Sequence, residues 1–426
     1  MDRYLRLLRR RDFALLWVGA TISALGDGMS FVALVWLLLD RGGDAADIGW
    51  LAAAYTGPVI VGGLVAGMLL DRYDRRRLLA ADNLVRGLAI ASLPVAAGLG
   101  ILTTAHLFVV AAIYGFLFMI SLAGLPAMIP GLVDREEFTT ANAMESLAYG
   151  IAGLAGPAAA GLLIAVAGAP LVLAIDAATY GVYVLCLLAM RASGSAAEGD
   201  GEDGGGTGMS GAAGRRSLRS AVAFILGSRP ILAITVMFVC FNVGEGMLIV
   251  LLPIYARDVL AEGAGAYGAM ASALTAGLLA GSLVVGAVGW RWPLGRSIAA
   301  AQALAGVALL GLLGQPPLIL AMGTLFASGV CASSLTAWAQ TIRMRLIPAE
   351  LRGRVFALLR STMQAAPPVG AIAAGLVLGG ATTGVPALVA AIVGVIALPG
   401  VVGAFLPALG AARAEPAEPE ARAAEG

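Results

Sequence analysis

Twelve long apolar segments determine what this chain can fold into. Each contains about 20 or more mostly apolar residues, the length that an α-helix needs to cross a lipid bilayer. In chain order they cover approximately residues 13–39, 48–70, 78–98, 104–126, 142–167, 170–190, 230–255, 266–289, 296–314, 317–340, 355–380 and 385–406. We therefore predict an all-α integral membrane protein with twelve transmembrane helices in two groups of six.

The composition agrees with lipid as the main solvent of this chain. Hydrophobic residues make up 60% of the 426 residues and charged residues only 12%, against about 25% charged residues in soluble proteins. A soluble protein needs a charged surface to stay dissolved, so it could not hide this much apolar side chain. The three cysteines are too few for a secreted disulfide scaffold. Soluble, disordered and disulfide-rich classes are therefore excluded.

The chain contains no lysine, because all 27 of its lysine or arginine positions are arginine. A Walker A loop needs a lysine to hold phosphate, so the chain carries no ATP-driven motor of that kind. Schiff-base chemistry with pyridoxal phosphate or retinal is excluded for the same reason. An ion gradient is then the expected energy source for any uphill movement of a solute.

The arginines lie almost entirely on one side of the predicted membrane, and only Arg41 and Arg257 fall in loops on the other side. Cytoplasmic loops of membrane proteins are enriched in arginine and lysine. We therefore predict that the N-terminus, the segment between the two groups of helices, and the C-terminus are cytoplasmic. The first apolar segment, although it follows an arginine cluster, is too long for a signal peptide and is interpreted as an uncleaved helix.

Composition divides the chain into four parts. Residues 1–190 and 229–407 each hold six predicted helices. Residues 191–228 are rich in glycine, serine and charged residues and are predicted to form a flexible cytoplasmic linker. Residues 408–426, rich in alanine, glutamate and proline, are predicted to be a disordered cytoplasmic tail.

The two groups of helices share an internal repeat. The Gly-acid-Gly triplet centred on Asp27 recurs 218 residues later around Glu245, and the stretch from Glu136 to Gly161 matches the stretch from Glu350 to Gly375 at an offset of 214. Two matches at nearly one offset indicate duplication of a six-helix unit, with both copies in the same orientation.

A charged motif connects the second and third predicted helices. Its distinctive residues are Gly67, Asp71, Arg72, Arg75 and Arg76. The glycine allows a neighbouring helix to approach, the acid can face the positive end of another helix, and the arginines can pair with acids or backbone carbonyls. The motif resembles the cytoplasmic signature of the major facilitator superfamily, G-x-L-x-D-R-x-G-R-R. The resemblance implies a latch that holds the two halves together in one state of a transport cycle.

Two departures from this signature are visible. Asp74 stands where the usual pattern has glycine. The equivalent loop of the second half keeps Arg291 and Arg296 but has Trp290 where the acid would be. We therefore expect one intact latch and one degenerate latch. The alternative is a positive loop that only sets the orientation in the membrane.

A group of small residues in the fifth predicted helix carries a second resemblance. Gly156, Pro157 and Gly161 resemble the Gly-Pro motif of exporters in this superfamily. Small residues permit close helix crossing and proline kinks a helix, so the motif also fits ordinary membrane packing.

Further short phrases narrow the resemblance to one group. They run from Arg11 to Trp17, Ser23 to Asp27, Asp71 to Arg77, Ala141 to Ala143, Ile175 to Ala177 and Glu350 to Val355. From about residue 9 to residue 406, the chain resembles the third drug:proton antiporter group, which includes bacterial macrolide and enterobactin exporters. The resemblance implies the major facilitator fold, two six-helix bundles with pseudo-two-fold symmetry, in a bacterial plasma membrane. It also implies alternating-access efflux of a small amphipathic drug, antibiotic or siderophore-like molecule in exchange for protons.

Two acids at membrane depth are the leading candidates for the site. Asp27 and Glu245 lie near the middle of the first and seventh helices, where burial makes a carboxylate take up a proton more readily than in water. We expect both to line a central cavity, Asp27 as the first choice for proton coupling and Glu245 as the second or as a docking point for a cation. Their flanking glycines are expected to loosen the helices. Alternatively, each acid caps unwound backbone or bonds a neighbour such as Asn242, itself a candidate.

Further charged residues within the predicted helices include three candidates. Asp176, about six residues into the sixth helix, is a further coupling candidate, although from there it can also reach the membrane interface. Asp82 and Arg86, four residues apart on the third helix, are expected to form an ion pair beside the latch. A structural role suits this pair best.

Aromatic and polar side chains in the helices offer contacts to a lipophilic ligand, although each also fits a lipid-facing or packing role. They are Trp36, Tyr55, Tyr149, Phe241, Trp338 and Gln340. His106 is the only histidine and the cysteines lie in separate helices, so we expect no metal site, no cofactor and no catalytic residues. The expected partners are a small-molecule substrate, protons and the lipid bilayer, around a monomer, with no nucleic acid.

Three alternatives to an exporter stay open. The first is a proton-coupled importer of a metabolite. The second, a membrane-embedded enzyme, is disfavoured because the sequence has no visible nucleophile–base or metal set. The third, a sensor that transports nothing, is disfavoured because the glycine-rich linker is a poor candidate for an additional soluble domain.

Overall fold

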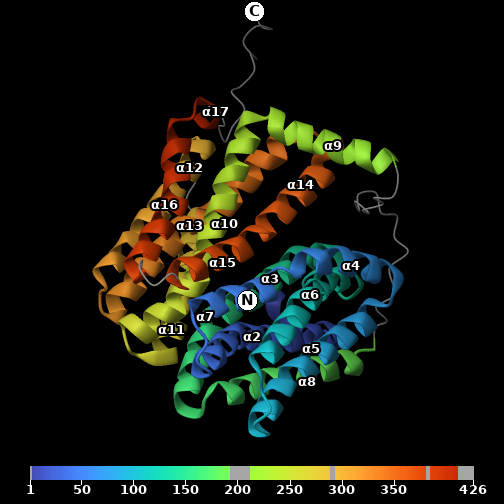
Figure 1. Ribbon diagram of the computed structural model, residues 1–426. Helices are drawn as coiled ribbons and strands as arrows, with labels where there is room; N and C mark the ends of the chain where they lie inside the picture. The colour runs from blue at the N-terminus through green and yellow to red at the C-terminus, as the bar shows by residue number, and fades with distance from the viewer. Residues whose placement is uncertain (1, 192–211, 288–292, 380–383, 411–426) are drawn as a thin grey trace, which may run out of the picture.

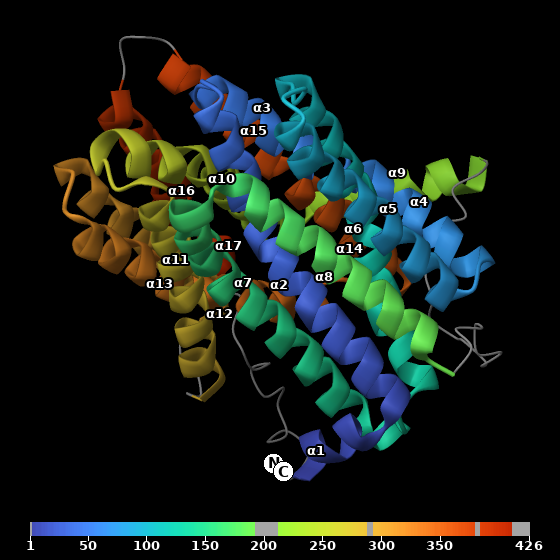
Figure 2. The ribbon, with the colours of Figure 1, turned by 90° about the horizontal axis from the view of Figure 1, so that it is seen from below.

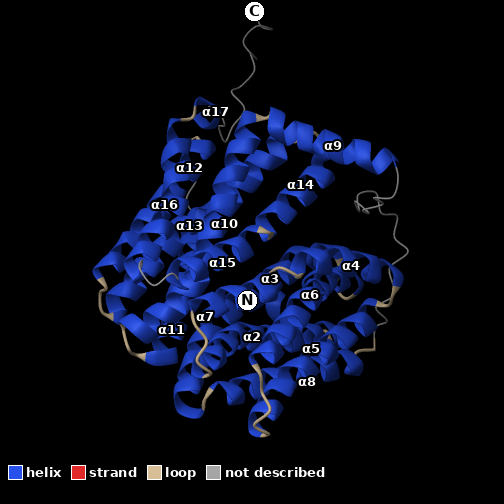
Figure 3. Ribbon diagram, viewed as in Figure 1, coloured by secondary structure: helices blue, strands red, loops and turns tan. Residues whose placement is uncertain are grey.

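All regular elements in the described part of the chain are helices. The computed structural model describes residues 2–191, 212–287, 293–379 and 384–410, and Figure 3 shows helices throughout these ranges. Within them, 12 helices or helix pairs are long and apolar enough to cross a membrane. The predicted number of spans is therefore confirmed.

The first six spans follow a short helix α1 (Asp2–Arg9). They are α2 (Arg11–Asp40), α3 (Ala45–Thr56) with α4 (Val59–Arg72), α5 (Arg75–Gly98), α6 (Thr104–Met128) with η1 (Ile129–Gly131), η2 (Arg135–Glu137) with α7 (Phe138–Ala167), and α8 (Ala169–Ala189). We call these elements the first half.

The last six spans form the second half and follow helix α9 (Ala212–Gly227). They are α10 (Arg229–Ile254) with the π-helical turn η3 (Tyr255–Val259), α11 (Gly263–Ala287), α12 (Leu294–Ala308) with η4 (Leu309–Gly314), α13 (Leu318–Leu346), α14 (Ala349–Gln364) with α15 (Ala366–Gly379), and α16 (Gly384–Phe405). A final turn, α17 (Pro407–Gly410), ends the described chain. Figure 1 shows the two halves as separate groups of helices joined along one edge.

Two spans that we predicted as single helices are interrupted. The second span breaks at Gly57, immediately before Pro58, and the eleventh breaks at Ala365, shortly before Pro367. Proline has no backbone N–H and clashes with the preceding helical turn, so it favours such a break. The first and seventh spans, which we expected the glycines to loosen, are instead continuous helices through Asp27 and Glu245.

The predicted linker and tail both contain helical residues. Ala212–Gly227, near the end of the linker, form the 16 residues of α9. Ala221 and Ile225 of α9 are buried against Val355 and Leu359 of α14, and this apolar contact explains why the segment is helical rather than flexible. The start of the predicted tail is also helical, because Leu409 of α17 is fully buried against α12. Residues 192–211 and 411–426 lie outside the described part of the chain.

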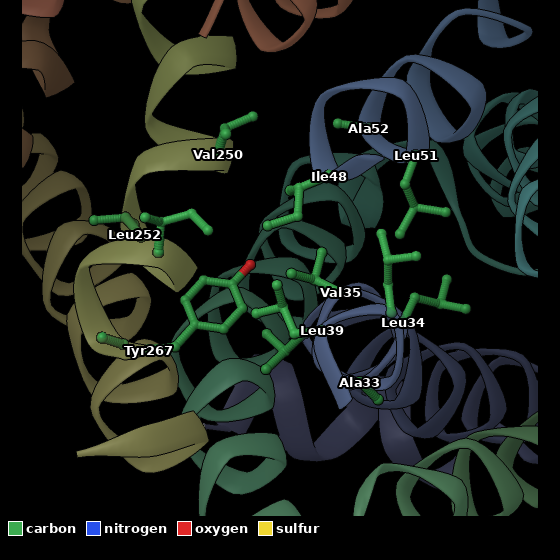
Figure 4. Packing of buried hydrophobic residues seen from close by; sticks show 14 of the residues in the cluster. Ala33, Leu34, Val35, Leu39, Ile48, Leu51, Ala52, Val250, Leu252 and Tyr267 are labelled. Atoms are coloured by element: carbon green, nitrogen blue, oxygen red, sulfur yellow. The ribbon is translucent and has the colours of Figure 1, made fainter. Parts of the chain in front are cut away.

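The two ends of the molecule differ in how the halves meet. We call the end with Arg191 and Arg229 the linker end, and the end with Arg41 and Arg257 the far end. At the far end one apolar core contains residues of both halves, among them Val35, Leu39, Ile48, Val250, Leu252 and Tyr267 (Figure 4). At the linker end each half has apolar clusters of its own. The halves are therefore joined at the far end, and Figure 1 shows α4 and α14 diverging toward the linker end.

Small residues allow the close contacts that join the halves. These contacts occur at two related places, each between the second span of one half and the fifth span of the other. A methyl group added at Gly49 of α3 would lie 2.6 Å from the carbonyl oxygen of Ala371 in α15. In the related position, a methyl group on Gly268 of α11 would collide with the carbonyl oxygen of Pro157 in α7. Backbone contact at this distance excludes a side chain. The second span of each half thus packs on the fifth span of the other, as the internal repeat requires.

Candidate functional site

A cavity of about 360 Å³ lies between the two halves. Its lining residues are Ala24, Asp27, Gly28, Tyr55, Thr56, Val59, Tyr114, Phe118, Tyr149, Ala152, Gly153, Gln364 and Pro367. Asp27 is the only charged residue among them. The helices that contribute are α2, α3, α4, α6 and α7 of the first half, and α14 and α15 of the second. The cavity is therefore largely apolar and aromatic around one carboxylate, which is the usual composition of a small-molecule site.

The position of Asp27 is set by the two glycines beside it. A methyl group added at Gly28 would lie 2.6 Å from the carbonyl oxygen of Ala152 in α7, and one added at Gly26 would collide with Asp176 of α8. Both positions must be glycine because α2 touches a neighbouring helix on each side. The glycines therefore serve close packing of α2 between α7 and α8 (Figure 2). The carboxylate between them lines the cavity from a helix that is continuous through Asp27.

Asp27 belongs to a network of charged and aromatic side chains. The hydroxyl of Tyr180 donates a hydrogen bond to Oδ1 of Asp27, and Nη1 of Arg86 lies 3.6 Å from its Oδ2. The guanidinium of Arg86 is 4.9 Å from the ring centre of Tyr180 and 5.5 Å from that of Tyr114. The Asp27 side chain is 19% exposed and that of Arg86 only 1%. A ligand in the cavity can therefore reach Asp27 but not its cationic partner.

Asp82 and Arg86 form an ion pair in the structure. Nη2 of Arg86 lies 2.7 Å from Oδ2 of Asp82, and Ser121 of α6 hydrogen-bonds to both side chains at 2.6 Å. Both side chains of the pair are buried. Arg86 also lies beside Asp27, so its guanidinium connects the pair to the cavity. One guanidinium thus serves two carboxylates in a medium where an unpaired charge is costly. The i,i+4 spacing predicted the pair but not its link to Asp27.

Asp176 is a second buried acid of the first half. Its carboxylate accepts hydrogen bonds from Ser30 of α2 and, at 3.1 Å, from Thr179. The side chain is fully buried and does not line the cavity, so the expectation that it can reach the membrane interface is wrong. Asp176 lies about one helical turn from Tyr180 on α8, on the far-end side.

Glu245 has a different environment from that of Asp27. Among the described residues, its carboxylate makes no hydrogen bond or ion pair, and it does not line the cavity. Asn242 instead donates a hydrogen bond of 2.7 Å to the carbonyl oxygen of Phe238, one turn earlier on the same helix. The alternative in which Glu245 bonds Asn242 is therefore not seen among the described residues. Asp27 lines the cavity, as we expected, whereas Glu245 is partly exposed and is not among the lining residues of this cavity.

The arginines of the latch motif hold the loop against its own half. Arg75 donates to the carbonyl oxygen of Ala127 at 2.6 Å, and Arg76 donates to that of Leu187 at 2.6 Å. These carbonyls lie near the ends of α6 and α8, where helical acceptors lack partners. Asp74 is the N-cap of α5 and accepts a backbone N–H at 2.9 Å. A capping acid therefore explains this departure from the signature.

The other latch residues face away from neighbouring helices. A methyl group added at Gly67 would meet open space, so the close approach that we expected at this glycine is absent in this conformation. Asp71 is exposed and has no polar partner among the described residues. The Arg72 guanidinium lies 5.9 Å from the centre of the adjacent Tyr73 ring. Residues 288–292, which include Trp290 and Arg291, are outside the described chain, so the degenerate second latch stays a prediction.

The helix-five motif packs in two directions. A methyl group on Gly156 would lie 2.8 Å from the Cα of Gly28 in its own half, and one on Gly161 would lie 2.5 Å from the carbonyl oxygen of Ala264 in the second half. Gly375, which matches Gly161 in the repeat, meets α3 of the first half in the same way. The motif therefore places α7 both inside its half and across the joint.

An aromatic wall completes the site. Tyr55 and Tyr114 are stacked with their ring centres 4.3 Å apart, and Phe118 and Phe31 continue the row at 5.7 and 4.9 Å. The sequence analysis predicted Tyr55 and Tyr149 as ligand contacts but not Tyr114 and Phe118. In an apolar helix, the sequence does not indicate whether an aromatic residue faces the cavity or the lipid.

The remaining ligand candidates do not line the cavity. Trp36 and Phe241 pack against apolar cores, Trp338 is buried in the second half, and Gln340 is exposed.

Twelve spanning helices in two related halves, around a central cavity with buried charge, define a membrane transporter of the major facilitator fold. Residues 5–422 match the family model described as a transmembrane secretion effector. The chain belongs to this family of major facilitator transporters, and it is a transporter rather than an enzyme.

Named relatives agree with this assignment. The chain is 27% identical to the multidrug efflux pump Tap of Mycolicibacterium fortuitum over 415 residues, which cover 94% of this chain and 97% of that protein. It is 25% identical to macrolide efflux protein A of Streptococcus pyogenes over 38% of this chain and 40% of that protein.

Solved structures share the fold at low sequence identity. The nucleoside transporter NupG has a TM-score of 0.68 at 15% identity, covering 95% of this chain and 98% of NupG. A bacterial homologue of ferroportin in an inward-facing state has a TM-score of 0.65 at 18% identity, covering 93% and 98% of the two chains.

Proposed function

We propose that this protein is a proton-coupled exporter of small amphipathic molecules that works by alternating access. The observation that carries the proposal is the cavity between the halves, with Asp27 as its only charge and aromatic rings along one wall. The efflux pumps among the relatives support export rather than uptake. The apolar lining suits a drug, antibiotic or siderophore-like molecule that partitions into membranes.

The proposed site is the bacterial plasma membrane, with the linker end in the cytoplasm. The distribution of arginines supports this orientation, since Arg41 and Arg257 are the only arginines of the far end. The shared core joins the halves at the far end, which in the proposed orientation supports a conformer open toward the cytoplasm. We propose that residues 1–190 and 229–407 move as the two bodies, connected by 191–228, with 408–426 as a cytoplasmic tail.

Asp27 is the proposed point at which substrate and proton compete. When Asp27 is ionised, it shares Arg86 with Asp82 and can attract a positively charged ligand. When Asp27 is protonated, its attraction for Arg86 and for a cation is lost, and Arg86 keeps its tighter bond to Asp82. Binding of substrate and binding of a proton at this one carboxylate then exclude each other, which is the requirement for exchange. The aromatic wall would hold the apolar or cationic part of the ligand.

Asp176 and Glu245 take subordinate places in this proposal. Asp176, buried one turn from Tyr180, is a second proton-carrying candidate on the far-end side of Asp27. Glu245 and Asn242 are not among the lining residues and have no ionic partner among the described residues, and we assign them a weaker influence on coupling.

The latch would act when the linker end closes. Within the described part of the chain, Gly67 faces open space and Asp71 has no polar partner in this conformation. Closure would bring α4 toward the start of α14, where a helix N-terminus offers unpaired N–H groups to an acid. Arg75 and Arg76 would keep the loop in place throughout, because their bonds lie within the first half.

Everted membrane vesicles test the function directly. Substrate added to vesicles with an acidic interior should release protons, measured with a pH-sensitive dye, and labelled substrate should accumulate inside. Asp27→Asn should abolish the proton signal while the protein stays in the membrane at the normal level. If no compound in a broad panel of lipophilic cations and antibiotics moves protons, proton-coupled export of such compounds is wrong.

A further inference from the structure

The two halves contribute unequally to the cavity. All of the lining residues except Gln364 and Pro367 belong to the first half. Because the proline side chain has no hydrogen-bonding atoms, Gln364 is the only second-half side chain in the lining that can bind a polar group. A ligand that touches both halves through polar contacts must therefore reach Gln364.

Gln364 stands at the break in the eleventh span. It is the last residue of α14, and Ala365 separates it from α15. Thr56, the last residue of α3, also lines the cavity. The two spans run antiparallel, and they touch where Gly49 meets Ala371. Counted from that contact toward the linker end, each break comes after about two helical turns, so the interruptions of the two spans lie at similar depth beside the cavity.

The amide of Gln364 has no partner of its own. The residue is half-buried, and no hydrogen bond of its side chain occurs among the described residues. A primary amide offers two donors and one acceptor. Gln302, a fully buried glutamine of the same half, differs in having partners for its amide. It donates to the carbonyl oxygens of Met237 and Ile396 at 2.9 and 3.2 Å. An unpaired amide at a cavity wall is available to a ligand.

We propose that Gln364 is a specificity-determining residue that binds a polar oxygen of the substrate. Asp27 takes the basic nitrogen, the aromatic wall takes the apolar frame, and the Gln364 amide takes a hydroxyl, carbonyl or ether oxygen elsewhere on the same frame. The substrate class is thus an amphipathic amine with a separate hydrogen-bonding oxygen. This inference rests on the proposed function, and it deepens it by assigning the second-half contact.

A consequence is that the bound molecule connects the two halves. Asp27 belongs to the first half, and Gln364 belongs to the second half at the point where its helix is interrupted. A compound that lacks the oxygen makes polar contacts with the first half alone. Such a compound is expected to bind more weakly, because it lacks the hydrogen bond to Gln364 that connects the substrate to the second half.

The test compares two basic amphiphiles that differ in a single hydroxyl group. Uptake into everted vesicles and equilibrium binding to the purified full-length protein are measured for the wild type, Gln364→Ala and Gln364→Asn. Gln340→Ala is the matched control, because Gln340 is an exposed glutamine outside the cavity. Gln364→Ala should raise KM and Kd for the hydroxylated compound about tenfold, the value of one lost hydrogen bond, and change those for the deoxy compound less than about twofold. Gln364→Asn should fall between.

Each outcome has a definite meaning. If the wild type transports both compounds and Gln364→Ala treats them as the wild type does, the role of Gln364 is wrong while the exporter proposal stands. Equal losses for both compounds also overturn it, because they indicate a structural effect. If the wild type binds and transports neither compound, both proposals fail.

Discussion

The two halves of the molecule have the same skeleton but different chemistry inside it. In each half, the third span carries a polar residue that bridges the first and sixth spans. In the first half this residue is Arg86, which joins Asp27 of α2 and Tyr180 of α8. In the second half it is Gln302, which joins the backbones of α10 and α16. One half therefore holds a charged network that can change state with a proton, and the other holds a neutral one that cannot.

The Gly-acid-Gly triplets make this difference clear. Both triplets pack against the fifth and sixth spans of their half. Gly26 meets the Asp176 carboxylate, whereas Gly244 meets the apolar side chain of Ile396. Duplication thus preserved the backbone contacts, while the side chains around the acids diverged. We infer that one half acts as the charged working surface and the other as the body that moves against it.

The largest effect should come from removing the shared guanidinium. Arg86→Met leaves Asp82 and Asp27 without a counter-charge and should destabilise the protein by about 3–5 kcal/mol, whereas Gln302→Leu should cost about 1–2 kcal/mol. Thermal unfolding of the purified proteins in detergent measures both. The double variant Asp82→Asn with Arg86→Met should recover part of the loss. Equal costs for Arg86→Met and Gln302→Leu would contradict the difference between the halves.

Neutralising the acid of the first half should reduce proton movement more than neutralising the acid of the second half. Asp27→Asn is expected to lower substrate-driven proton movement about a hundredfold, or ~2.7 kcal/mol, because it removes the only charge in the cavity. Glu245→Gln should lower it less than about fivefold, since Glu245 does not line the cavity. Proton release in everted vesicles, normalised to protein amount, gives the comparison. A larger loss for Glu245→Gln would reverse our assignment of the working half.

Packing, in contrast, should be equally sensitive in both halves. Gly161→Val and Gly375→Val each force a side chain into the joint at the far end and should weaken it by about 1–2 kcal/mol. Spin labels at Asp40 and Glu262, in place of these side chains, report the separation of the far-end loops, which should increase for both variants. Gly181→Val is the control, because a methyl group there meets open space. A response from only one of the two variants would show that the joint is not symmetric.

The smallest effect concerns an ion pair that only the first half has. Arg10 pairs with Asp134 and lies 2.9 Å from Glu137, whereas Ser228 occupies the equivalent place 218 residues later. Arg10→Ser should cost less than about 1 kcal/mol, because the pair is partly exposed to solvent. Thermal unfolding at several pH values measures the cost, and a loss as large as that of Arg86→Met would contradict it.

The pH dependence of this small effect follows from the charge of Arg10. Its hydrogen bond to Asp134 raises the pKa of Arg10 above the usual value. A folded-state pKa that is raised contributes stability below the unfolded pKa and loses it as pH rises through the folded value. The arginine side of the pair therefore titrates only at strongly alkaline pH, and the cost of Arg10→Ser should not change near neutrality on that account.

Much of the fold was predictable because it depends on properties that are local in sequence. Helix length and apolar content predicted the twelve spans, and the repeated glycines around Asp27 and Glu245 predicted the duplication. The Asp82–Arg86 pair was predictable from a spacing of four residues on one helix. Each of these signals lies within one helix or is repeated along the chain.

The site was less predictable because it depends on which helix faces meet. Nothing in the sequence relates Arg86 to Asp27, which are 59 positions apart, or shows that Tyr114 rather than another aromatic residue faces the cavity. Membrane helices are apolar all round, so hydrophobic periodicity does not distinguish an inward face from a lipid-facing one. The difference between Asp27 and Glu245 has the same cause, since their local sequences are alike and only their neighbours differ.

The shared apolar core at the far end should make the equilibrium between the two conformers depend on temperature. When the cavity opens toward the far end, water must reach side chains such as Val35, Ile48 and Leu252 that now exclude it. Hydration of apolar surface carries a large positive change in heat capacity. The equilibrium between the two conformers should therefore follow a curved rather than a linear van 't Hoff plot. The working temperature range of the transporter would then be set by this core as much as by the charges at Asp27.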